Sequence, residues 1–252
     1  MDSLANPTAA ASAQAWRAWA AFHSGDLDQA ERLSLAILES AAFRLMIQRS
    51  FAECLYAAVR VRRGTDASLM DEFFAKIEDA RRRGEETAVI VYEQWLAHEW
   101  LFSDASSAAA LAEQLQARGG PVGPLACFAR VTAGLAALAL DDIAAAREHS
   151  TKASSLAKEV RWPLYEVRCD YLAALLPSAE LSERRDLAER AVHRARECHL
   201  GLELAQCLEV AASVAEPDLA KRHLAELDRL TSTLGLEVEF LPTRAALRSV
   251  RG

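Results

Sequence analysis

Apolar residues recur at helical spacing along most of the chain, and short polar breaks separate these runs. Residues 16–22 form an aromatic and Ala-rich run that ends at Ser24 and Gly25, and Asp26 then precedes a second run. Asp26 is a typical N-cap residue. The second run predicts a helix with one apolar face, because its apolar residues recur three and four positions apart: Leu27, Ala30, Leu33, Ile37 and Leu38. Together the two runs predict a hairpin of antiparallel helices.

The same helix–turn–helix pattern recurs five more times. The later hairpins turn near residues 64–66, 103–104, 141–142, 177–178 and 216–217. Equivalent positions of the second helices recur about every 38 residues, at Ala30, Met70, Ala108, Ala146, Ala188 and Ala220. One hairpin cannot bury both helical faces, whereas a stack of hairpins shares a continuous core. The pattern therefore predicts an all-α fold, a right-handed α-solenoid of about six antiparallel helix hairpins.

The repeat pattern also predicts the domain boundaries. We expect a disordered N-terminus at residues 1–7 and the repeat domain at residues 8–236. The Gly- and Pro-rich residues 119–124 are the predicted hinge inside that domain. Residues 237–252 are expected to form a C-terminal capping helix and tail, with the helical pattern at residues 241–250.

Composition agrees with this prediction and narrows the function classes. Ala and Leu make up about a third of the chain, whereas Gly occurs 10 times and Pro 7 times. The formal net charge of -7 makes nucleic acid an unlikely class of partner. The start of the chain lacks the features of a secretion signal, and no apolar stretch is long enough for a membrane span. We therefore expect a cytoplasmic protein that binds no membrane, with its five cysteines as reduced core thiols.

The segment from Gly25 to Ala30 resembles the turn and second-helix start of a tetratricopeptide repeat. Ala18 and Gly134 fall where that family places a small residue on the first helix of each hairpin. The mean period is nearer that of the loose repeats in bacterial signal-transduction regulators. The resemblance implies a superhelix whose first helices line a concave binding face.

Motifs for catalysis and metal binding are missing from the sequence. His98 and Glu99 lack the second histidine, four residues from the first, that a zinc protease helix requires. Cys198, His199 and Cys207 do not have the spacing of a zinc site. No set of nucleophile, base and orienting group is recognisable. We expect a protein that is not an enzyme and has no cofactor, no metal and no catalytic residues.

A concave face that binds a protein or peptide segment is the leading hypothesis for function. The resemblance to tetratricopeptide repeats predicts its partner-binding residues: Trp19, Phe22, His23, Glu93, Trp100, Phe128, Val131 and Leu135. Such a face suits an amphipathic helix or an extended peptide. Arginines of the first helices are candidate ligands for the carboxylates of an acidic peptide: Arg17, Arg49, Arg130 and Arg168.

Two alternatives stay open. The chain resembles the repeat regions of bacterial regulators enough to suggest a ligand- or peptide-responsive regulatory sensor that acts through a partner protein. The Ala- and Trp-rich first hairpin also suggests self-association into a homodimer, because an apolar end repeat exposes a surface that a second copy can cover.

Overall fold

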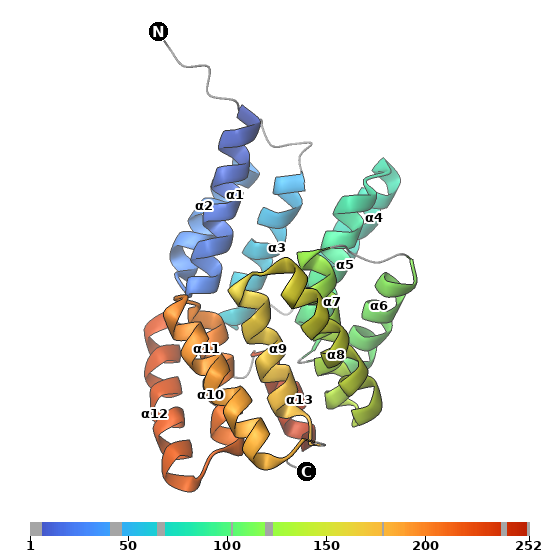
Figure 1. Ribbon diagram of the computed structural model, residues 1–252. Helices are drawn as coiled ribbons and strands as arrows, with labels where there is room; N and C mark the ends of the chain where they lie inside the picture. Colours follow the sequence, from blue (N-terminus) through green and yellow to red (C-terminus); the bar gives the residue numbers. More distant parts are fainter. Residues whose placement is uncertain are drawn as a thin grey trace. The chain divides into compact units, whose positions relative to one another are not determined.

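A computed structural model describes most of the chain, at residues 7–40, 47–64, 69–101, 103–118, 123–177, 179–237 and 241–250. Within these residues every regular element is a helix, which confirms the predicted all-α class (Figure 1). The backbone divides into two compact units, Met1–Tyr92 and Glu93–Gly252. Many consecutive helices pack against each other within each unit. Of the predicted disordered segment, residues 1–6 lie outside the described residues, and Pro7 already belongs to the first helix.

The first unit contains α1 (Pro7–Ser24), α2 (Leu27–Glu39), α3 (Ile47–Arg62), α4 (Leu69–Arg83) and the first part of α5 (Glu86–Trp100). The predicted first turn is confirmed. Gly25 adopts a φ of +87°, which a residue without a side chain reaches at little cost. The Asp26 carboxylate then accepts a hydrogen bond of 3.0 Å from the backbone N–H of Gln29 and caps α2. α1 and α2 pack together, and both contact α3.

The second unit continues with the rest of α5 and the helices that follow it. These are α6 (Ala105–Ala117), α7 (Pro124–Ala139), α8 (Ile143–Val160), α9 (Pro163–Leu175), α10 (Leu181–Glu197), α11 (Gly201–Val214), α12 (Pro217–Leu234) and α13 (Thr243–Val250). Asp104 and Asp142 cap α6 and α8, each accepting a backbone N–H at 3.0 Å. Both caps stand at the turns that the sequence predicted.

Alternate helices of the second unit also pack against one another, α7 on α9 and α9 on α11. Gly134 permits the approach of α7 to α9, because a Cβ atom there would lie 2.7 Å from the Leu172 side chain. α7 is buried from Ala126 to Leu138 except at Arg130, since α6, α8, α9 and α13 all contact it. It is therefore a central helix of this unit.

α13 confirms the helix predicted near the C-terminus, although it does more than cover the end of the array. It packs against α7, α9 and α11, which are the first helices of three successive predicted hairpins. Of the predicted hinge, residues 119–122 lie outside the described residues, and Gly123 has a φ of +56°.

The five cysteines are free, as predicted, but they are not all core residues. Four of them are buried: Cys54, Cys127, Cys169 and Cys207. Cys198 is half-buried, because it forms the C-cap of α10 at a turn.

Candidate functional site

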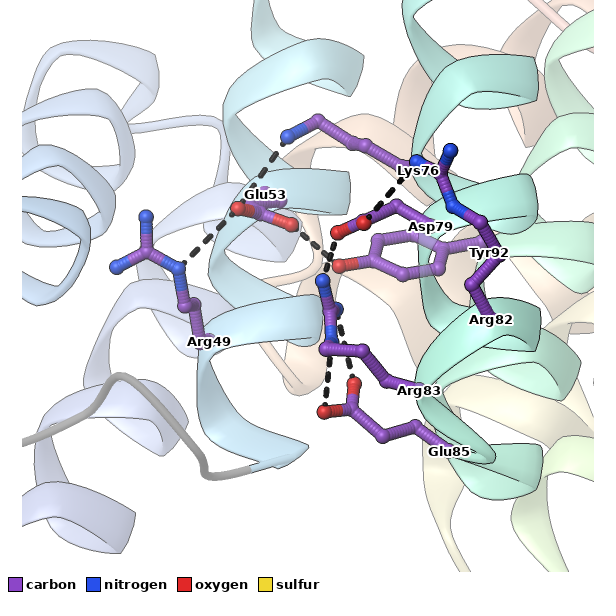
Figure 2. A network of polar contacts seen from close by, with 8 residues as sticks. All are labelled: Arg49, Glu53, Lys76, Asp79, Arg82, Arg83, Glu85 and Tyr92. Atoms are coloured by element: carbon purple, nitrogen blue, oxygen red, sulfur yellow. Dashed lines mark hydrogen bonds and ion pairs between the residues drawn. The ribbon is translucent and has the colours of Figure 1, made fainter.

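A polar cleft of about 790 Å³ opens in the first unit, where the N-terminal half of α3 faces the end of α4 and the start of α5. It is lined by Ile47, Arg49, Ser50, Glu53, Lys76, Asp79, Arg83, Gly84, Glu85, Glu86, Thr87, Ala88 and Tyr92. Acidic and basic side chains dominate this lining. The cleft has the size of a small-molecule or peptide side-chain site, and its polar network is shown in Figure 2.

Glu53 is the centre of one half of the network. Its side chain is only 12% exposed, and its carboxylate lies 3.4 Å from Arg49 Nε and 3.2 Å from Lys76 Nζ. The Tyr92 hydroxyl donates a further hydrogen bond to the same carboxylate. The three donors come from α3, α4 and α5, so this one acidic group links three helices. Two cations share it, which leaves this end of the cleft with a net positive charge.

Arg83 is the centre of the other half. Its Nε and Nη2 atoms donate to the two Glu85 carboxylate oxygens at 2.8 and 2.9 Å, and it also pairs with Asp79. The turn between α4 and α5 makes this geometry possible. Gly84 takes a φ of +71°, and the N–H of Glu85 returns to the carbonyl of Ala80. Together with Glu86, these groups make this end of the cleft acidic.

The electrostatics of these groups follow from burial and pairing. Burial and the bond to Glu53 raise the pKa of Tyr92 far above its usual value. The hydrogen bond from Arg83 lowers the pKa of Glu85, so this carboxylate stays ionised at neutral pH. Tyr92 is thus a fixed hydrogen-bond donor to Glu53, and Glu85 stays a charged partner of Arg83.

A second, smaller cavity of about 210 Å³ shares Arg49, Glu53 and Lys76 with the cleft. Its other lining residues are mostly apolar or aromatic: Leu38, Tyr56, Ala57, Phe73 and the acidic Glu72. The three shared side chains are therefore a common wall, with a polar cavity on one side and an apolar cavity on the other.

The residues that the sequence predicted for partner binding do not line either cavity. Phe22 and His23 are buried residues of α1, and Glu93 is buried in α5 beside Arg118. The other three are buried residues of α7: Phe128, Val131 and Leu135. These six residues are at most 4% exposed. Only Trp19 and Trp100 are half-buried; the Trp19 ring lies 4.3 Å from that of His23.

Among the four candidate arginines, Arg49 is the one that lines the cleft. Arg168 is instead buried in the second unit and paired with Glu203 at 2.8 Å. Sequence reasoning missed Glu53, Lys76 and Tyr92. The basic run of residues 81–83 was a usable signal: it lies in the last turn of α4, where cations complement the helix dipole, and Arg83 also organises the acidic half of the cleft.

Comparison with models of protein families, with curated protein sequences and with solved structures finds no match to this chain. No described helix is both long and apolar enough to cross a membrane. Across the described residues, no group of His, Cys, Asp and Glu side chains is arranged to hold a metal ion.

Proposed function

We propose that this protein is a noncatalytic interaction module that binds a peptide segment of a partner protein in the cleft of the first unit. The observation that carries the proposal is the wall of Arg49, Glu53 and Lys76, with a polar cavity on one side and an apolar one on the other. The packing of consecutive helices supports a scaffold of stacked hairpins. We extend the proposal to a right-handed solenoid of about six hairpins that is similar to tetratricopeptide repeats.

The charges of the wall suit an acidic side chain of the ligand. The side chains of Arg49 and Lys76 are 32% and 37% exposed, and both pair with a single carboxylate. Ion pairs that contact water contribute about 0–1 kcal/mol each, so a second carboxylate can join them at little cost. A guanidinium also binds a carboxylate with directional hydrogen bonds. We therefore expect an acidic residue of the peptide to lie between Arg49 and Lys76.

The two cavities define what flanks that acidic residue. The apolar cavity beside Tyr56 and Phe73 accepts an aliphatic or aromatic side chain. The opposite end of the cleft, with Glu85 and Glu86, attracts a basic side chain. The expected ligand is an extended peptide with a basic, an acidic and an apolar residue in this spatial order.

The chemistry of Tyr92 and Glu53 supports a noncatalytic role. Tyr92 holds its proton, since burial and Glu53 raise its pKa. Glu53 already accepts from Tyr92 and pairs with two cations, so it is poorly placed to remove a proton from a substrate.

A peptide library tests the proposal. Selection of random 12-residue peptides on the full chain should enrich sequences with an acidic residue next to an apolar one. Binding of a selected peptide, followed by fluorescence anisotropy, should weaken by about tenfold in Lys76→Glu, because a cation at the wall becomes an anion. Lys152→Glu is the matched control, since Lys152 is an exposed residue of α8. Enrichment without acidic residues, or equal affinity in the Lys76→Glu variant, contradicts the proposal.

A further inference from the structure

α13 lies on a helical face of the second unit with an amphipathic pattern of its own. Thr243, Ala246 and Leu247 are all buried, and they stand at positions i, i+3 and i+4 of the helix. Leu241, just before the helix, is buried as well. The face beneath is made by α7, α9 and α11. An isolated helix of eight residues is unstable in water, so α13 depends on this face for its helical state.

A buried carboxylate on α11 recognises the start of α13. Glu209 is 1% exposed, and it accepts a hydrogen bond of 3.1 Å from the Thr243 hydroxyl. Arg244 Nη1 lies 2.5 Å from the same carboxylate, and the Arg244 side chain is 32% exposed. A buried charge needs polar partners to offset the loss of hydration. α13 supplies two such groups, a hydroxyl and a cation on successive residues.

The contacts of α13 have the features of a docked peptide helix: an apolar stripe against neighbouring helices and a polar anchor at one end. Residues 235–242 connect it to α12, which ends at Leu234 with Gly235 in the left-handed conformation. A segment tethered in this way competes with a free ligand at an effective concentration in the millimolar range. A free helix then binds measurably only when its affinity for the face is high or when α13 is displaced.

We propose that the face of α7, α9 and α11 is a docking site for an amphipathic helix of a partner protein, and that α13 is its occupant within the chain. The partner helix carries a Ser or Thr followed by a basic residue, with small and aliphatic side chains three and four positions after the hydroxyl. It binds by displacing α13 and takes over the contacts with Glu209. This site belongs to the second unit, so it does not depend on the cleft of the first.

A labelled peptide with the sequence of residues 241–252 tests this proposal against the full chain. The unmodified protein should bind it weakly, because α13 occupies the site. Leu247→Asp, which places a charge on the buried stripe of α13, should raise the affinity at least about tenfold by freeing the face. Adding Glu209→Gln to that variant should lower the affinity again by about tenfold. A peptide carrying Arg244→Glu should bind the Leu247→Asp variant about as weakly as the unmodified peptide binds the double variant.

Hydrogen exchange of the unmodified chain gives a second readout. The amides of α13 should exchange at least about tenfold faster than those of α11, because α13 undocks without unfolding of the unit. Three results would each overturn the proposal, because α13 would then be an integral core helix. These are equal exchange rates of α13 and α11, loss of helical circular dichroism in Leu247→Asp, and unchanged peptide affinity in that variant. Lys76→Glu should leave this affinity unchanged, which separates the docking face from the cleft.

Discussion

Replacing Glu203 by Gln would leave the Arg168 guanidinium buried without its counter-charge. Arg168 Nη2 donates to Glu203 Oε1 at 2.8 Å, and both side chains are almost completely buried. The Phe128 ring lies 4.8 Å from Arg168 Cζ and adds a cation–π contact. Burial acts to lower the pKa of Arg168, but Glu203, Tyr171 and Tyr165 together outweigh it and the pKa is raised. Arg168 therefore stays protonated across the usual pH range.

The size of the effect follows from this geometry. Two unit charges about 4 Å apart interact by about 4 kcal/mol at an effective dielectric constant of about 20. Removing one partner of a buried pair destabilises proteins by about 3–5 kcal/mol, because the remaining charge stays dehydrated. Glu203→Gln keeps the side-chain volume, so no cavity contributes. We expect the free energy of unfolding of the second unit to fall by about 3 kcal/mol.

Urea unfolding followed by circular dichroism measures this change, with Glu197→Gln on the exposed end of α10 as the control. The double variant Arg168→Met, Glu203→Leu should recover most of the loss, because apolar residues of similar volume need no counter-charge. A loss below about 1 kcal/mol in Glu203→Gln would refute the reasoning, as would a double variant less stable than the single one.

Gly134→Leu should destabilise the second unit by about 1–3 kcal/mol in the same urea assay, because the new side chain overpacks the approach of α7 to α9; unchanged stability would show that the helices separate freely. His149 gives a pH-dependent prediction. Burial lowers its pKa below the usual 6.5, and Arg130 donates to its Nδ1 at 3.2 Å, so the folded state holds the neutral ring. The unfolded state binds the proton more tightly, and stability should therefore fall as the pH drops below about 6.5. The His149→Gln variant should flatten that slope between about pH 7 and pH 5, and an unchanged slope would exclude His149 as its source.

Features that depend on neighbours within four residues were predictable from the sequence. Asp26, Asp104 and Asp142 each cap the helix that follows, because a carboxylate at that position reaches the backbone N–H three residues later. The turn at Gly25 is local in the same sense, whereas residues 243–250 carry a local helical pattern but need tertiary contacts to stay helical. The all-α class then follows from the repetition of such signals along the chain.

The partner-binding prediction depended on which face of a helix stays open, and the structure places most of its residues in the interior. Phe128, Val131 and Leu135 were assigned to an exposed concave face by resemblance, yet α7 is buried along almost its whole length. An apolar residue suits a core and a binding face equally well, so its type does not separate them. The contact of α13 with α7 joins residues more than a hundred positions apart, and no periodicity reports it.

The chain by itself determined the helices and the aspartate caps of α2, α6 and α8. Only the tertiary structure decided that Glu53, Lys76 and Tyr92 meet in one cleft and that Glu209 anchors α13. The physical reason is the range of the interactions. Helix formation and capping are settled by hydrogen bonds within a turn, whereas a charged side chain finds its partner only after the helices have packed.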